Sequence, residues 1–93
     1  MKNNFQKILY IPEKFKRIDI NCFKKTDVEE VFIPNSIEEI GCCAFSNCKN
    51  LRKVTFEDGI RLKKIYGNAF LRCTNLKDIS LPEGLESIGE RCF

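Results

Sequence analysis

The chain has 93 residues, a length that allows one small domain at most. Hydrophobic residues make up 43% and charged residues 31% of it, which is typical of a folded and soluble chain. The net charge of +3 is small and its charges are scattered, so nucleic-acid binding is not expected. No apolar run approaches the ~20 residues that span a bilayer, so membrane insertion is not expected either.

The N-terminal segment, residues 1–7, precedes the repeated pattern and is predicted to be a separate segment or a cap. No continuous apolar block follows Lys2, so a secretory signal peptide is not expected. Without an export signal, the six cysteines are best explained as reduced thiols. The chain alone therefore favours a cytoplasmic location, whereas a cell-surface location is expected if it is part of a longer protein.

An internal repeat with a period near 23 residues runs through residues 8–93. Its clearest marker is a phenylalanine that recurs at Phe23, Phe45, Phe70 and Phe93. Apolar residues at fixed offsets divide the chain into units of approximately 11–32, 33–55, 56–80 and an incomplete 81–93. Because one such unit is too small to bury its own apolar side, the pattern predicts a solenoid in which successive units stack.

Each unit is predicted to contain a strand, a second short strand and a return segment. Val54-Thr55-Phe56 alternates inward, outward and inward residues, which is typical of a strand. The I-x-x-I-G segments predict the second strand, with Gly41 and Gly89 supplying the bend after it because glycine accepts a positive φ. The segments CAFSNC and NAFLRC are interpreted as helical turns or tight loops that lead to the next strand.

The repeated unit resembles the BspA-like class of leucine-rich repeat. IPNSIEEIGCCAFSNCKNLRKVTF, residues 33–56, carries the full pattern, whereas the first unit has Asp19 in place of Gly and Cys22 in place of Ala. The resemblance implies a leucine-rich-repeat-type solenoid that is rich in β-structure, with short parallel strands stacked coil on coil. It also implies a role in protein binding, in bacteria and protists often in cell-surface adhesion, and it brings no catalytic motif.

Four cysteines occupy repeated positions for small residues. Cys48 and Cys73 follow the repeat phenylalanine by three residues, whereas Cys22 and Cys92 directly precede it, where other units have alanine. Because free cysteine behaves as a small apolar residue, all four are predicted to fill the core. A disulfide between Cys48 and Cys73 is compatible with stacking at strand spacing, but it would need an oxidising compartment.

Metal, cofactor and catalytic chemistry find little support in the sequence. No histidine and no C-x-x-C motif occur, which argues against structural zinc. Without histidine, no cysteine has the usual base that holds a nucleophile as thiolate. The chain is therefore predicted to hold no metal or cofactor, to have no catalytic residues and not to be an enzyme. Of Cys42 and Cys43, one is expected to face outward, and residues 57–59 are interpreted as a turn.

The outward positions of the first strand in each unit predict a binding surface for a protein partner. Large aromatic residues on an exposed strand are candidates for interface anchors. Tyr10 and Phe32 could instead pack against each other or under the N-terminal segment, because the first edge of a solenoid needs covering. The partner-binding candidates on this strand face are Tyr10, Phe32, Lys53, Thr55, Asp78 and Ser80.

The last unit stops at Phe93, before the second half of the pattern and without a polar capping repeat. Such an end exposes apolar surface and strand edges, so we expect either a fragment of a longer array or an end covered by another chain. End-to-end self-association through this uncapped end is one such arrangement. Two functions remain open: a protein–protein interaction module that binds on the strand face, with a link to adhesion, and a structural spacer or truncated repeat fragment without a binding role.

Overall fold

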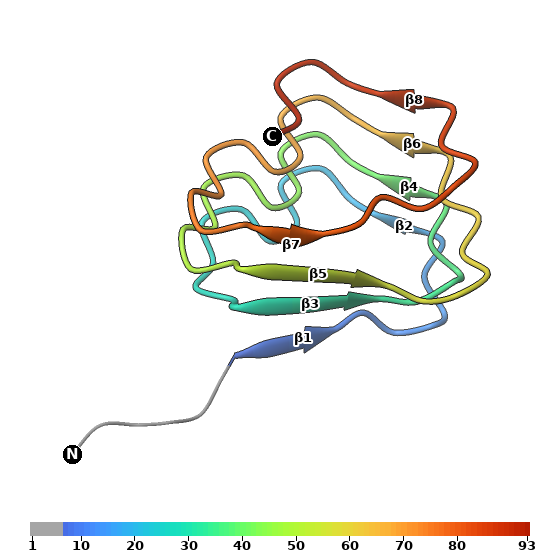
Figure 1. Ribbon diagram of the computed structural model, residues 1–93, viewed down its shortest axis with the longest axis horizontal. Helices are drawn as coiled ribbons and strands as arrows, with labels where there is room; N and C mark the ends of the chain where they lie inside the picture. The colour runs from blue at the N-terminus through green and yellow to red at the C-terminus, as the bar shows by residue number, and fades with distance from the viewer. Residues whose placement is uncertain (1–6) are drawn as a thin grey trace.

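The computed structural model describes residues 7–93 as a solenoid of about four stacked coils (Figure 1). Most of the predicted N-terminal segment, residues 1–6, lies outside the described residues. The described part of the chain contains short strands and no helix, so the return segments are turns and not helical turns. The strands are β1 Ile8–Tyr10, β2 Arg17–Ile18, β3 Glu30–Ile33, β4 Glu39–Ile40, β5 Lys53–Phe56, β6 Lys64–Ile65, β7 Asp78–Ile79 and β8 Ser87–Ile88.

The strands form two parallel sheets that both run the length of the stack. The first sheet has the order β1-β3-β5-β7 and the second has the order β2-β4-β6-β8. Equivalent residues of neighbouring coils lie opposite each other, as Val31 and Val54 do in the first sheet and Ile40 and Ile65 in the second. Strands contact only their neighbours in the same sheet. The predicted leucine-rich-repeat-type solenoid of parallel strands is thereby confirmed.

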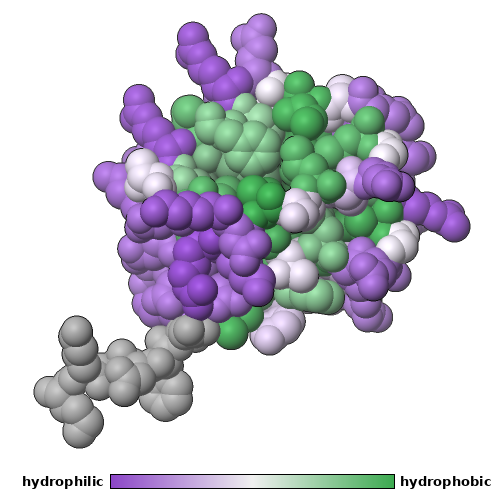
Figure 2. All heavy atoms as spheres, in the orientation of Figure 1, coloured by the Kyte–Doolittle hydropathy of each residue, from purple (hydrophilic) through white to green (hydrophobic). Residues whose placement is uncertain are grey.

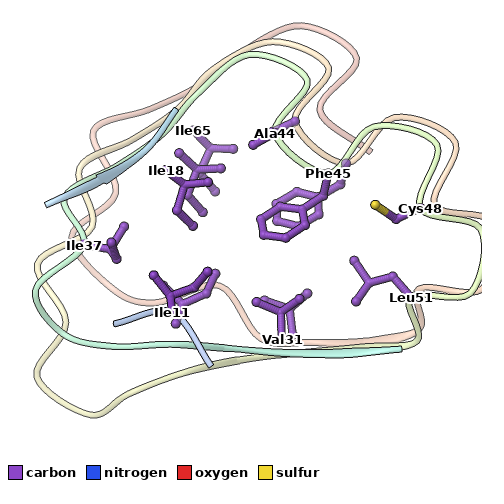
Figure 3. Packing of buried hydrophobic residues seen from close by; sticks show 14 of the residues in the cluster. Ile11, Ile18, Val31, Ile37, Ala44, Phe45, Cys48, Leu51 and Ile65 are labelled. Atoms are coloured by element: carbon purple, nitrogen blue, oxygen red, sulfur yellow. The ribbon is translucent and has the colours of Figure 1, made fainter. Parts of the chain in front are cut away.

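The core lies inside the coils, where equivalent side chains form rows along the stack. Figure 3 shows Ile18 and Ile65 in one such row on the side of the second sheet. Phe45 and Cys48 point into the same interior from the turn side. Phe45 is fully buried, and burying such a side chain contributes about 1.5–3 kcal/mol. The strands and turns of a coil thus enclose a shared apolar interior, as the repeat pattern predicts.

The turn segments use left-handed backbone at two fixed positions in each coil. Positive φ occurs two residues before and two residues after the repeat phenylalanine, as at Cys43 (φ 58°) and Asn47 (φ 60°) around Phe45. The N–H groups of these residues reach the next coil: Cys43 donates to the carbonyl of Gly67 at 3.2 Å and Asn47 to that of Leu71 at 2.7 Å. Every second N–H group in this segment bonds the neighbouring coil and not a carbonyl of its own turn, so a continuous helix does not form.

The positive φ expected at Gly41 and Gly89 is wrong, because the described glycines with positive φ are Gly59 and Gly84. A Cβ atom on Gly41 would lie 2.8 Å from the carbonyl oxygen of Ile18 in the preceding coil. A Cβ atom on Gly89 would lie 2.3 Å from a backbone nitrogen of the coil before it. Glycine is therefore required at both positions by the close approach of two backbones.

The core role predicted for the cysteines holds at three of the four repeated positions. Cys48 and Cys92 are buried, and Cys73 is partly buried against the core. All of the cysteines are free thiols. Cys42 and Cys43 are both half-buried, so neither faces fully outward.

Cys22 contradicts the prediction, because its side chain is exposed. The side chain at this position points to the preceding coil, as the thiol of Cys92 does toward the carbonyl of Tyr66, 3.8 Å away. Cys22 lies in the first coil, and among the described residues no coil precedes it. The same repeat position is therefore buried in the middle of the stack and exposed to solvent in the first described coil.

Candidate protein-binding surface

The outer face of the first sheet places three of the predicted residues in one row. Tyr10 of β1 lies opposite Phe32 of β3, and Phe32 lies opposite Thr55 of β5. Ser80 follows Ile79, where β7 ends, so it extends the row from outside the strand. We call Tyr10, Phe32, Thr55 and Ser80 the outer row.

Tyr10 and Phe32 form an aromatic pair at one end of the outer row. Their ring centroids are 6.1 Å apart and their planes are tilted by 43°. The rings thus pack against each other, as one of the two explanations from the sequence proposed. Nevertheless Tyr10 remains 66% exposed and Phe32 is only half-buried. Any cover by residues 1–6 lies outside the described residues. The pair therefore combines a fixed geometry with a large apolar surface open to contact.

A charged row lies beside the outer row. Glu30 is opposite Lys53, and Lys53 is opposite Asp78, so the sign of the charge alternates from coil to coil. The ammonium nitrogen of Lys53 lies 3.9 Å from the Asp78 carboxylate, and the Arg52 guanidinium hydrogen-bonds Glu30. Exposed pairs of this kind contribute only about 0–1 kcal/mol to stability. Their side chains can therefore exchange these partners for groups on a bound protein with little loss of folding free energy.

Two thiols line up inside the coils on the turn side. The thiol of Cys48 donates to the carbonyl of Phe23 at 3.1 Å, and that of Cys73 donates to the carbonyl of Phe45 at 3.0 Å. The neighbouring Cys73 side chain, together with Thr26, outweighs burial and lowers the pKa of Cys48 to about 6. The same contact and burial raise the pKa of Cys73. Because Cys48 is fully buried, its thiol bonds core carbonyls and is not open to substrates.

A shallow groove on the second sheet was not predicted. It has a volume of about 400 Å³ and lies beside Gly41, with Ile20 and Tyr66 among its lining residues. Ile20 is 66% exposed and Tyr66 is 38% exposed. Tyr66 occupies the position that Gly41 and Gly89 occupy in their own coils. A tyrosine at a glycine position is the sequence signal that could have drawn attention to this groove.

Residues 7–93 contain neither a cluster of metal-ligating side chains nor a membrane-spanning helix. Within this range, no group of three or more His, Cys, Asp and Glu side chains gathers at one place. The same residues form no helix of the length and hydrophobicity needed to cross a membrane.

The repeat pattern matches a known family over the full length of the chain. The family model for the BspA type leucine rich repeat region (6 copies) matches residues 1–93. The chain belongs to this BspA-type leucine-rich-repeat family. Leucine-rich-repeat proteins of this kind are generally protein-interaction or surface proteins, and the fold is typically non-enzymatic. None of the curated proteins matches the chain.

Several solved bacterial structures are similar to this BspA-type solenoid. A leucine-rich repeat protein from Bacteroides capillosus has 28% identity and a TM-score of 0.80 over 89% of this chain. The T. pallidum leucine rich repeat protein TpLRR has 26% identity and a TM-score of 0.82 over 90% of it. A leucine rich cell surface protein from Faecalibacterium prausnitzii has 27% identity and a TM-score of 0.73 over 95% of it. The chain spans 66%, 41% and 33% of these three structures, respectively.

Proposed function

We propose that this BspA-type solenoid is a protein-interaction module that binds its partner on the outer face of the first sheet. The observation that carries the proposal is the aromatic pair of Tyr10 and Phe32, which is held in place by the sheet while Tyr10 stays 66% exposed. A tyrosine with a fixed ring supplies a large contact area and loses little conformational entropy on binding. The general role of the family in protein interaction supports this assignment.

The arrangement of the two rows indicates the chemistry of the partner. Tyr10 and Phe32 offer apolar surface at one end, and Thr55 and Ser80 continue the outer row with small hydroxyl side chains. A segment with aromatic or aliphatic side chains opposite the rings fits this surface, with polar groups opposite the hydroxyls. The charged row would then set the orientation of the partner, because complementary charges specify register more than affinity.

A role at the cell surface is the finer form of this proposal. The F. prausnitzii structure is described as a leucine rich cell surface protein, and the similarity covers 95% of this chain and 33% of that structure. Adhesion through the outer row would then be the corresponding activity. Its test is the detection of the full-length protein on intact cells with an antibody against residues of the turn side, which the proposed partner does not cover.

The experiment that tests the proposal compares variants of the outer row and the charged row with a variant near the second sheet. Partners captured from a cell extract by the immobilised chain are identified and then titrated against purified variants. Tyr10→Ala and Lys53→Glu are expected to weaken binding at least tenfold with an unchanged melting temperature. Tyr66→Ala, which removes an exposed aromatic ring from the second sheet, is the matched control and should bind like the wild type. Loss of binding in the control alone would contradict the assignment.

A structural spacer is the second candidate function. It is favoured by the fact that the chain spans only 41% of the T. pallidum structure and 33% of the F. prausnitzii structure, which are longer chains. Coils in the middle of an array can serve only to hold other coils at a distance. In that case neither tyrosine variant would change the binding of any partner by the longer protein, whereas deletion of one whole coil would.

A further inference from the structure

The two repeated cysteine positions differ in how they distribute thiols along the stack. Directly before the repeat phenylalanine, two alanines separate the thiols, because successive coils carry Cys22, Ala44, Ala69 and Cys92. Three residues after it, successive coils carry Thr26, Cys48 and Cys73. The second position therefore places two thiols in neighbouring coils, whereas the first does not.

Thr26, Cys48 and Cys73 occupy the same place in their turns. The N–H group of each bonds the carbonyl of the repeat phenylalanine of its own coil, at 3.2 Å in all three turns. The Thr26 hydroxyl lies 3.4 Å from the sulfur of Cys48, so side chains at this place contact each other between neighbouring coils. Cys48 precedes Cys73 by one coil in the same way, and the Cys73 side chain is the largest influence on the pKa of the Cys48 thiol.

The spacing of the two turns matches the requirements of a disulfide. The rings of Phe45 and Phe70, which belong to the same two turns, lie 5.4 Å apart and almost parallel. A disulfide joins residues whose Cα atoms are about 4.4–6.8 Å apart, a range that includes this coil spacing. The thiols of Cys48 and Cys73 also point the same way, since each donates to a carbonyl one coil back. Rotation of the two side chains can therefore join the sulfur atoms while the coils stay stacked.

The pair lies within the stack and behind a polar surface. The turn of Cys48 joins β4 to β5, and the turn of Cys73 joins β6 to β7. Figure 2 shows hydrophilic side chains at the lower left, where Figure 1 places the turn that leads into β5. Cys48 is fully buried, which excludes bulky reagents. Hydrogen peroxide is little larger than water, so it reaches the pair when a turn opens locally.

We propose that Cys48 and Cys73 form a site of reversible oxidation, at which hydrogen peroxide converts the two thiols into a disulfide. The new bond fastens both ends of the coil that contains β5 and β6, because the two cysteines flank these strands in the chain. The buried Cys92 has Ala69, and not a thiol, at its position in the preceding coil. Cys92 is therefore expected to stay reduced under the same conditions.

The oxidation takes two steps. The neighbouring Cys73 side chain lowers the pKa of Cys48 to about 6, so Cys48 is largely a thiolate at neutral pH. Its sulfur attacks one oxygen of hydrogen peroxide, the O–O bond breaks, and the departing hydroxide takes up a proton to become water. The resulting sulfenic acid of Cys48 is attacked by the sulfur of Cys73, which gives up its proton as the S–O bond breaks. A second water leaves, so two thiols and one peroxide yield one disulfide and two water molecules.

Peptide mapping of the oxidised chain tests the proposal. The folded chain is treated with hydrogen peroxide, its remaining thiols are blocked, and it is digested without reduction by trypsin and chymotrypsin. Cleavage after Phe45, Lys49, Arg72 and Lys77 releases Cys48 within residues 46–49 and Cys73 within residues 73–77. We expect these two peptides as one disulfide-linked species, which dithiothreitol separates again. The melting temperature should rise by roughly 5–15 °C on oxidation, because the link restricts the unfolded chain.

Two variants separate a specific link from general oxidation. Cys73→Ala should lose both the linked peptides and the rise in melting temperature. Cys92→Ala, which also removes a buried thiol, is the matched control and should retain both. A chain in which Cys22 becomes oxidised while Cys48 and Cys73 stay reduced overturns the proposal. So does a link that forms only in urea, because the fold would then hold the two thiols apart.

Discussion

Phe45 and Phe70 lie face to face in the interior, with ring centroids 5.4 Å apart and planes only 4° apart. Phe23 continues the row on one side and Phe93 on the other, at the same centroid separation. Each of the two central rings is therefore covered on both faces by another phenylalanine. This row confirms the stacking that the spacing of the phenylalanines in the sequence predicts, and it makes the central rings the largest buried side chains of the core.

Replacing a central ring should destabilise the solenoid strongly. Phe45→Ala removes a fully buried side chain that has a ring on each face, and such truncations cost about 3–5 kcal/mol. The free energy of unfolding measured by urea denaturation should fall by this amount. Phe93→Ala is the matched control, because that ring stacks on one side only and is 54% exposed. Equal losses for the two variants would contradict the enclosed row.

Gly41→Ala should also destabilise the protein, for a different reason. The added methyl group would lie 2.8 Å from the carbonyl oxygen of Ile18, so neighbouring coils would have to separate locally. Strain of this kind costs about 1–3 kcal/mol and should appear as a lower melting temperature. Gly67→Ala is the control, since the nearest atom to its methyl group would be 3.3 Å away. A larger loss at Gly67 than at Gly41 would refute the role given to close approach.

The left-handed turn positions offer a stabilising substitution. Arg72 has a φ of 61° and an exposed side chain, and a non-glycine residue in this region is strained. Asparagine tolerates the region better, so Arg72→Asn should raise the free energy of unfolding by a few tenths to ~1 kcal/mol. Arg61→Asn changes an exposed arginine whose φ is not positive and should bring no gain. The same gain at both sites would show that loss of positive charge is responsible.

The pair of buried thiols predicts how stability depends on pH. The neighbouring Cys73 side chain lowers the pKa of Cys48 to about 6, whereas the thiol of an unfolded chain titrates near 9.0. The unfolded state therefore binds more protons between these values, so stability should increase from about pH 6 to pH 9. The raised pKa of Cys73 acts in the opposite direction above pH 9, where only the unfolded state ionises this thiol.

Cys73→Ala removes the side chain that acts most strongly on the pKa of Cys48. The increase in unfolding free energy between pH 6 and pH 9 should become smaller in this variant. Urea denaturation at several pH values, compared between wild type and variant, measures the difference. Cys22→Ala changes an exposed thiol and should leave the wild-type pH profile intact. An unchanged profile in Cys73→Ala would disprove the coupling of the two thiols.

The repeat period made the architecture accessible from the sequence, because residues at equal offsets must become neighbours when units stack. This reasoning places Tyr10, Phe32 and Thr55 in one row, as the sheet register shows. Ser80 follows the last residue of β7, so its place in this row stays a prediction. Positions at an edge are thus less predictable than positions between two coils.

The predictions from the sequence that differ from the structure have related causes. The reason for glycine at Gly41 is the distance to another backbone, which no local pattern reveals. The exposure of Cys22 arises because no coil precedes the first one among residues 7–93, although its sequence position matches the buried Ala44. The groove beside Tyr66 forms because one coil has glycine, Gly41, where the next coil has the large side chain of Tyr66. All three depend on which coil neighbours which, and not on the unit itself.

Among the strands that the structure describes, contacts join only adjacent coils of one sheet, and none links the first coil to the last. A tensile force applied at the two chain ends would therefore act on one interface at a time. Coils would unfold one after another from an end, and each would lengthen the molecule by about two dozen extended residues. Such a molecule would behave as an extensible tether whose length changes in equal steps under load.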